Sequence, residues 1–487
     1  MAPTARGETN FVEKSVVKVF STVRYPDPYE PWSKRSAIDE TGSGVVISAH
    51  RILSNAHLVL YASQIQIQAN QSGDKLAATV EAVAPGIDLA VLKVDDATFF
   101  DSHPPIVMAT NLPEIKDTVM AYGYPEGGAT LSITKGIVSR VEFSRYSTSV
   151  SGLRLQVDAP INPGNSGGPA MAGDKMVGLT YSTLSAAQGI GYVIPNEEIQ
   201  LFLDDIADGH YDGKPAMRDV FQTLENASLR SFLEVPKDVS GVVVYEPDSD
   251  DPAYPLRRWD VITKIGDQII DDQGMVAISG GPRLSFLYFV QKVASHGTIP
   301  LTLFRKGHET KIELPVSAKD PRLIPSLDGE YPSYFIYGPL AFSTATRSFV
   351  DGLIGGTNGQ RYTAWLSAEG SPLLSRSWDK PAFEGEGLVV VTSPFFPHAL
   401  ARGYSNPVGE VVKFVDGVRI KNLANLVEVL RDSKEAFTTF EFVNRYGERL
   451  VFPRKEIIAA TDEILTDNGI RSQGSPDTMA IWNAVKK

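Results

Sequence analysis

The sequence predicts a mainly β protein in which a strand-rich N-terminal domain precedes two copies of a smaller module of strands and helices. Three observations lead to this prediction. The first ~200 residues hold many short segments rich in β-branched residues, separated by Gly, Pro, Asn and Asp. A strand–turn–strand pattern then occurs twice, with corresponding residues 150 positions apart. The 487 residues also match about three domains of roughly 100–200 residues each.

The N-terminal domain is predicted strand by strand. We expect strands at residues 15–20, 44–48, 64–68, 89–94, 136–141 and 176–181. Short strands at regular spacing, with turn residues between them, are typical of a barrel or a sandwich. The first segment with a helical pattern spans residues 196–206, and we interpret the polar stretch 208–215 after it as a linker.

The repeated module has the order strand, Gly/Asp turn, short strand, helix and hairpin. Its turns fall at residues 265–267 and 415–417, and its helical patterns at 284–294 and 423–430. Because the elements recur in one order, we interpret the two segments as copies of one fold. We expect residues 358–386 to form an irregular insertion in the second copy.

Composition excludes several functions. The formal net charge of −12 argues against nucleic acid as the main partner, because binding a polyanion requires clustered Lys and Arg. The chain has no cysteine, which excludes disulfides, thiolate metal ligands and a cysteine nucleophile. No apolar run reaches ~18 residues, so we expect no membrane-spanning helix. The acidic residues 248–251 lack the alternating ligands and glycine of a calcium loop, and we expect no metal and no cofactor.

The strongest motif is a glycine-rich string around Ser166. It reads Asn162-Pro163-Gly164-Asn165-Ser166-Gly167-Gly168-Pro169. A serine nucleophile needs backbone N–H groups that stabilise the oxyanion, and Gly164 has the backbone freedom to aim its N–H at the same point as that of Ser166. We therefore expect Ser166 to be a nucleophile and residues 164–166, including Asn165, to form an oxyanion hole. The alternative is a Gly/Pro turn with an incidental serine.

A base and an acid are also present. His57 follows Ser54-Asn55-Ala56 where a strand ends, and Asp88 opens an apolar strand, where an unpaired buried charge would be costly. Taken singly, the histidine could be structural and the aspartate could cap a turn. Together His57, Asp88 and Ser166 have the His–Asp–Ser chain order that accompanies a double β-barrel in trypsin-like enzymes. We predict a catalytic triad.

These strings resemble the HtrA/Deg family of serine proteases. The matching segments are residues 41–46, 54–57, 88–91, 164–169 and 189–195. The resemblance implies a trypsin-like double β-barrel followed by two PDZ-like α+β domains, and it is strongest to the plant-type Deg branch or a bacterial relative of it. The implied division is a protease domain at residues 1–212, a first PDZ at 213–320, a divergent second PDZ at 321–460 and a C-terminal tail at 461–487.

The resemblance also implies an activity and an assembly. Such proteases degrade unfolded or damaged proteins without ATP, through an acyl-enzyme, and some act as chaperones under stress. They form trimers, or larger assemblies of trimers, through the N-terminal part of the protease domain. The aromatic residues available for such contacts are Phe11, Phe20, Tyr25, Tyr29 and Trp32, although the barrel core could equally hold Phe20. A chaperone or scaffold with a latent protease site is the alternative function, and a PDZ-based adaptor is a second one.

Specificity, peptide binding and location are less constrained. Ile161, Thr180 and Ile190 are expected to line the specificity pocket, and because none is charged we expect cleavage after small or medium apolar residues. In the first PDZ, residues 229–236 are the expected carboxylate-binding loop, but they contain no glycine, which leaves peptide binding open. The second PDZ is expected to have a structural or assembly role. We expect a periplasmic location, with a chloroplast or another organelle as the alternative.

Overall fold

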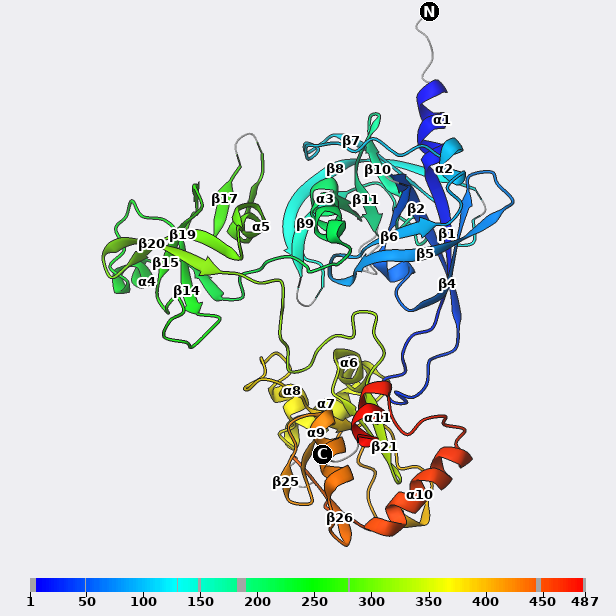
Figure 1. Cartoon of the computed structure of the whole chain (residues 1–487). Coiled ribbons are helices and arrows are strands. Elements are labelled where there is room, and N and C mark those ends of the chain that lie inside the picture. Colours follow the sequence, from blue (N-terminus) through cyan, green and yellow to red (C-terminus); the bar gives the residue numbers. More distant parts are fainter. Residues whose placement is uncertain are drawn as a thin grey trace, which may run out of the picture. The chain divides into compact units, whose positions relative to one another are not determined.

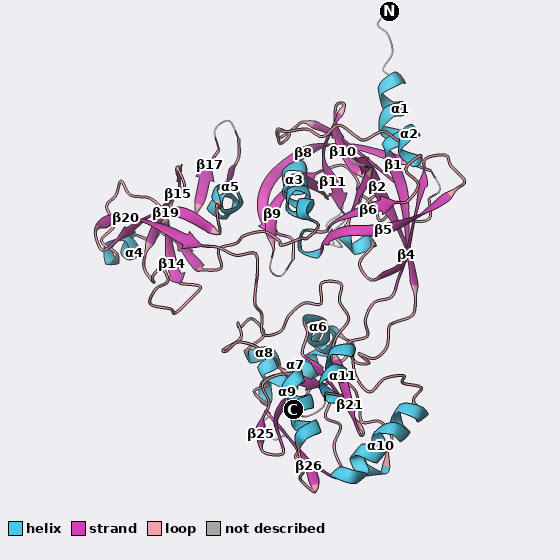
Figure 2. Ribbon diagram, viewed as in Figure 1, coloured by secondary structure: helices cyan, strands magenta, loops and turns pink. Residues whose placement is uncertain are grey.

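The chain folds into two compact units in the computed structural model (Figures 1 and 2). The structure describes residues 6–48, 50–128, 130–147, 150–181, 190–278, 281–443 and 448–484. The first unit contains residues 1–23 and 39–320, and the second contains residues 24–38 and 321–487. Within the described ranges, no helix has the length and apolarity required to cross a membrane.

Two closed six-stranded barrels form the N-terminal part of the first unit, which confirms the mainly β prediction (Figure 2). The first barrel has the order β1-β2-β3-β6-β5-β4, with β1 (Val16–Val23), β2 (Ile38–Ile47), β3 (Arg51–Ser54), β4 (Ala62–Ala69), β5 (Lys75–Ala84) and β6 (Leu89–Val94). The second has the order β10-β11-β12-β9-β8-β7, with β7 (Thr118–Gly123), β8 (Ser132–Arg145), β9 (Ser151–Val157), β10 (Pro169–Ala172), β11 (Lys175–Tyr181) and β12 (Gly191–Pro195). Neighbouring strands are antiparallel, and their inward-facing Val, Ile and Leu side chains fill the barrels.

Helices α1 (Arg6–Ser15), α2 (Phe99–Ser102) and α3 (Asn196–Asp205) flank the barrels. Helix α3 matches the predicted helix at 196–206 and begins after Pro195, a residue that favours an extended backbone before a helix. Ile199 and Phe202 are buried in the core. The Asn196 side-chain amide donates to the Ala109 and Met176 carbonyls at 2.9 and 2.5 Å, which fixes the start of α3 against β11.

A five-stranded antiparallel path, β13-β14-β15-β19-β20, makes up the region expected to be the first PDZ domain, within the same unit, with β16 added beside β15. Its elements are β13 (Val220–Thr223), α4 (Ala227–Phe232), β14 (Val242–Glu246), β15 (Val261–Ile265), β16 (Gln268–Ile269), β17 (Met275–Ala277), β18 (Arg283–Ser285), η4 (Phe286–Phe289), α5 (Val290–Val293), β19 (Thr298–Arg305) and β20 (His308–Pro315). The prediction of a carboxylate-binding loop at 229–236 is wrong. The Asn226 side chain accepts the Ser228 and Leu229 N–H groups and caps α4, so these backbone donors belong to a helix. β13 and β20 are the two end strands of this path.

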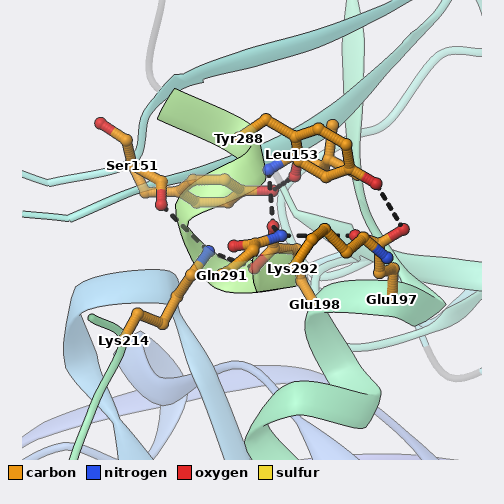
Figure 3. A network of polar contacts seen from close by, with 9 residues as sticks. Ser151, Leu153, Glu197, Glu198, Lys214, Tyr288, Gln291 and Lys292 are labelled. Carbon is orange, nitrogen blue, oxygen red and sulfur yellow. Dashed lines mark hydrogen bonds and ion pairs between the residues drawn. The ribbon is translucent and has the colours of Figure 1, made fainter. Parts of the chain in front are cut away.

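A buried carboxylate joins the first PDZ to the second barrel (Figure 3). Glu198 on α3 is fully buried, accepts the Leu153 N–H of β9 at 2.7 Å and pairs with Lys214 at 2.5 Å. The Lys214 ammonium also donates to the Ser151 carbonyl at 3.0 Å. Gln291 of α5 reaches the same carboxylate at 3.3 Å. A buried charge is tolerated only with such partners, and here they come from β9, the linker and α5.

A second acid on α3 extends this junction. Glu197 accepts the Tyr288 hydroxyl at 3.0 Å and pairs with Lys292 of α5 at 2.9 Å (Figure 3). The Tyr288 ring lies 6.1 Å from the Phe143 ring of β8. The interface between protease and first PDZ is therefore polar along α3 and aromatic along β8.

The second unit contains the region expected to be the second PDZ domain. It has a three-stranded sheet, β21-β22-β23, and a four-stranded sheet, β25-β24-β26-β27. Its elements are β21 (Tyr334–Tyr337), β22 (Leu340–Thr344), α6 (Arg347–Gly355), α7 (Gly359–Ala368), α8 (Pro372–Ser375), β23 (Val389–Val391), β24 (Val412–Val415), β25 (Val418–Arg419), α9 (Leu423–Asp432), β26 (Phe437–Phe442), β27 (Leu450–Pro453), α10 (Arg454–Asp467) and α11 (Pro476–Trp482). β21 pairs with β22, so one edge of β22 is already covered by a strand of the same chain.

Two expectations for this unit differ from the structure. Residues 358–386 hold α7 and α8 instead of an irregular insertion, and the Leu366 and Leu373 side chains of these helices are buried in the core. The C-terminal residues do not form a separate tail. Helix α10 runs through the boundary expected at 460/461, and on α11 the Trp482 ring lies 5.1 Å from the Phe335 ring of β21.

Candidate active site

Strand pairing places His57 beside Asp88. β3 and β6 are antiparallel, with Ser54 opposite Ala90, so the residue after the end of β3 and the residue before the start of β6 lie at the same end of the barrel. The His57 Nδ1 atom lies 2.8 Å from Asp88 Oδ2 and 3.0 Å from Oδ1, and the His57 backbone N–H donates to Oδ1 at 2.9 Å. The Asn55 amide holds the Asp88 carbonyl at 2.8 Å. The carboxylate thus orients both the ring and the backbone of His57.

The environment of His57 favours its protonated form. Burial of the ring acts to lower the pKa of His57, but the hydrogen bond and negative charge of Asp88, together with Glu40, outweigh it and raise the pKa above its usual value. Asp88 has a left-handed backbone, with φ of 59°, at the end of the 3₁₀ turn Pro85–Ile87. Aspartate tolerates this conformation better than most residues, which is one reason for its place here.

Ser43 on β2 connects the nucleophile segment to the histidine segment. Its N–H donates to the Ser166 carbonyl and its hydroxyl to the Gly164 carbonyl, each at 2.8 Å. Its own carbonyl accepts the Ser54 hydroxyl at 2.8 Å, three residues before His57. Ser43 of β2 is therefore hydrogen-bonded both to the segment that carries Ser166 and to the segment that precedes His57.

The Pro163–Gly164 peptide has a defined orientation. The Pro163 carbonyl accepts the Glu126 N–H at 2.9 Å. Because C=O and N–H point in opposite directions across a trans peptide, the Gly164 N–H points away from Glu126. Gly164 has φ of 93°, and a Cβ there would lie 2.4 Å from the Tyr124 carbonyl oxygen. Only glycine fits this turn.

The same argument orients the Ser166 N–H. The Asn165 carbonyl accepts the Thr180 hydroxyl at 2.7 Å and the Gly168 N–H at 3.0 Å, so the Ser166 N–H points to the opposite side of that peptide. The expected contribution of Asn165 to the oxyanion hole differs from the structure. Its N–H donates to the Asn162 carbonyl at 3.0 Å, which closes the turn within the chain.

The three residues expected in the specificity pocket have different environments. Thr180 has no exposed surface and its hydroxyl is bonded within the nucleophile turn, so it supports that turn from behind. The Ile161 side chain touches Gly191, where a Cβ would lie 2.6 Å from Ile161 Cδ1. Ile190 is 38% exposed. Residues 182–189, which precede Ile190, lie outside the described residues.

Sequence reasoning missed the role of Ser43. The string Thr41-Gly42-Ser43-Gly44 marked only a resemblance, because a serine in a strand has no chemical signature of its own. Gly167, with φ of 86°, is the residue from which the close approach of another segment could have been predicted. A Cβ there would lie 2.0 Å from the Ser43 carbonyl oxygen, so the glycine permits the close approach of the two segments.

Comparisons with known proteins identify two domain families in the chain. The Trypsin-like peptidase domain family matches residues 42–179, and the PDZ domain family matches residues 325–477. Among solved structures, "HtrA-type protease AlgW with tripeptide" is similar in fold, with a TM-score of 0.51 and 24% identity. That similarity covers 66% of this chain and 98% of the other.

Two plant proteins of Arabidopsis thaliana are similar over most of their length. "Protease Do-like 4, mitochondrial" is 32% identical over 424 residues, which cover 86% of this chain and 77% of the relative. "Protease Do-like 2, chloroplastic" is 31% identical over 473 residues, which cover 96% of this chain and 75% of the relative. With this identity over three quarters of each relative, together with the trypsin-like and PDZ domains, the chain belongs to the Do-like (HtrA/Deg) family of serine proteases.

Proposed function

We propose that this serine protease is an endopeptidase that degrades unfolded or damaged proteins without ATP, using His57, Asp88 and Ser166 as its triad. The observation that supports this most is that Asp88 is hydrogen-bonded to both the ring and the backbone N–H of His57. Ser43 links this pair to the turn that carries Ser166. The orientation of the Gly164 and Ser166 N–H groups supports a proposed oxyanion hole made by these two residues.

The proposed reaction forms and breaks an acyl-enzyme. The Ser166 hydroxyl oxygen attacks the scissile carbonyl carbon while its proton passes to His57, and Asp88 stabilises the resulting imidazolium. The N–H groups of Gly164 and Ser166 stabilise the oxyanion. His57 then gives its proton to the leaving amine. In the second half-reaction His57 takes a proton from a water molecule, and the water oxygen attacks the acyl carbon. The ester bond to Ser166 breaks, the acid product leaves, and His57 returns the proton to the Ser166 oxygen.

Labelling with a fluorophosphonate probe, with β-casein digestion beside it, tests this proposal. Wild type should label and digest casein in the absence of nucleotide, and Ser166→Ala should do neither. Ser228→Ala, an exposed serine on α4, is the control and should behave as wild type. Wild type that neither labels nor cuts, even with unfolded substrate and heating, would support the alternative of a chaperone or scaffold with a latent site.

Substrate preference follows from the pocket walls. We propose that Ile161 and Ile190, supported by Thr180, select small or medium apolar side chains at the cleavage point, because none of the three offers a charge to a basic side chain. Mass spectrometry of casein fragments reads this directly. Cleavage mainly after Lys or Arg would contradict it.

Assembly and location are proposed from the family. We propose a trimer or an assembly of trimers, which sedimentation velocity of the purified chain would detect. Phe11 of α1 is 40% exposed and available to such a contact, whereas the Phe20 ring lies between Lys18 and Lys75, 5.0 and 3.6 Å from their ammonium groups. The mitochondrial and chloroplastic names of the relatives favour an organelle over the periplasm, and subcellular fractionation would decide between them.

A further inference from the structure

The segment between β1 and β2 has an unusual composition and an unusual place. Residues 25–32 read Tyr-Pro-Asp-Pro-Tyr-Glu-Pro-Trp, with three prolines and three aromatic residues. Both of its ends continue into strands of the first barrel, yet residues 24–38 fold with the second unit (Figure 1). We call residues 24–38 the strap.

Tyr29 of the strap lies on α6 of the second PDZ. Its ring centroid is 5.8 Å from that of Phe349, at an interplanar angle of 60°. A Cβ at Gly352 would lie 2.9 Å from the Tyr29 hydroxyl oxygen, so this glycine on α6 makes room for the tyrosine. A cavity of about 320 Å³ lies beside Tyr29, with Leu353 and Tyr362 in its walls. Burial also raises the pKa of the Tyr29 hydroxyl, which is consistent with a ring seated in the domain.

Trp32 packs at a second site on the same domain. Its ring centroid lies 5.2 Å from Phe396 and 6.4 Å from Tyr334, the latter in an edge-on arrangement. Trp32 packs on an apolar cluster that includes Ile336 of β21 and Ile464 of α10. The side chains of Tyr29 and Trp32 thus reach two separate clusters of the same domain.

Polar contacts hold the ends of the strap. The Tyr331 hydroxyl donates to the Arg24 carbonyl at 2.8 Å, and the Lys34 ammonium lies 4.0 Å from the centre of the Tyr331 ring. The Arg35 N–H donates to the Tyr25 carbonyl at 2.9 Å and closes the base of the strap. The strap is therefore attached at its base and at Tyr29 and Trp32.

From these contacts we propose that the second PDZ domain carries a binding site for a short segment of alternating proline and aromatic residues, and that its resident ligand is the strap of the same chain. Prolines restrict the free segment, so it loses little conformational entropy on docking. The site is built from α6, Phe396 and Tyr334. It is separate from the edge of β22, where a PDZ domain would add a peptide strand and where β21 already lies.

The first test measures how well the strap is protected. Limited digestion with trypsin, in a Ser166→Ala background that prevents self-cleavage, can cut after Lys34 and Arg35. The double variant Tyr29→Ala/Trp32→Ala should be cut there about tenfold faster or more, because local opening no longer breaks aromatic contacts. Trp259→Ala, on the first PDZ, is the control and should leave the rate unchanged. Equal cleavage in wild type and double variant would overturn the proposal.

The second test uses a synthetic peptide of residues 24–35 with a fluorescent label. It should bind the double variant, whose site is vacated, at least about tenfold more tightly than wild type, whose site is filled. The same peptide with Tyr29→Ala and Trp32→Ala should not bind. To check that the double variant is folded, it is also made with Ser166 intact and labelled with fluorophosphonate. If it labels, but the peptide binds neither wild type nor the double variant, the proposal is overturned.

A cross-link identifies which chain supplies the strap. Because the chain has no cysteine, Lys34→Cys with Tyr331→Cys introduces one reactive pair for a short bismaleimide. Cross-links within one chain are expected. Cross-links between two chains would show that a second copy fills the site and would overturn the assignment of the chain's own strap as its ligand. Of these readouts, only the fluorophosphonate labelling that checks folding depends on the proposed catalytic function.

Discussion

At the scale of single residues, the pair of His57 and Asp88 makes a prediction about pH. The base must be neutral to accept a proton, and Asp88 raises the pKa of His57, so fluorophosphonate labelling should rise with pH through a midpoint above the ordinary histidine value of about 6.5. Asp88→Asn should lower that midpoint and reduce the rate by about 10⁴-fold. Asp101→Asn, on the surface helix α2, should change neither. A midpoint in the Asp88 variant equal to that of wild type would contradict the assigned role.

Ser43 makes a different prediction, because it acts through the nucleophile turn. Its hydroxyl donates to the Gly164 carbonyl and accepts the Tyr124 N–H, both at 2.8 Å. Ser43→Ala should loosen the oxyanion donors and lower kcat about 10- to 100-fold. The midpoint of the pH profile should not move, since the base and its acid are untouched. A shifted midpoint, or an unchanged kcat, would show that Ser43 does not position this turn.

At the scale of elements, the buried ion pair of Glu198 and Lys214 is expected to hold the first PDZ on the protease. Removing one partner leaves a buried charge, so Lys214→Met should lower the free energy of unfolding by about 3–5 kcal/mol. Replacing both, with Glu198→Leu and Lys214→Met, should recover much of the loss. The exposed pair of Arg449 and Glu441 is the control, and Arg449→Met should cost at most about 1 kcal/mol. Urea unfolding measures all three variants.

The strands were predictable because their signals are local. Residues 89–94 were predicted as a strand and form β6 with those bounds, since an apolar run between turn residues has few alternatives. α4 was mistaken for a loop because it is only six residues long, and its start is marked by one N-cap residue, Asn226, that was not recognised as a cap. The packing sites of Tyr29 and Trp32 could not be predicted from the sequence. Aromatic residues in a short loop fit a subunit contact and a contact with a distant domain equally well, and only the three-dimensional fold separates them.

At the scale of the whole molecule, the two PDZ domains should differ in peptide binding. The outer edge of β22 is covered by β21, whereas β13 is an open edge beside η4, with Phe221 of β13 and Phe286 of η4 at a ring distance of 5.1 Å. A peptide that binds by strand addition should therefore occupy at most one site per chain. Isothermal titration calorimetry of the Ser166→Ala chain with peptides from an unfolded substrate measures this number.

The variant Phe221→Asp sharpens this prediction, because it places a charge beside β13 and leaves the second domain unchanged. Peptide binding by strand addition should be lost in Phe221→Asp, while Phe437→Asp, at an exposed position on β26 of the second domain, should bind as wild type does. Two equivalent sites per chain, or binding that persists in Phe221→Asp and is lost in Phe437→Asp, would place recognition on the second domain. The expected result makes the first PDZ the domain that engages substrate and the second the domain that binds the strap.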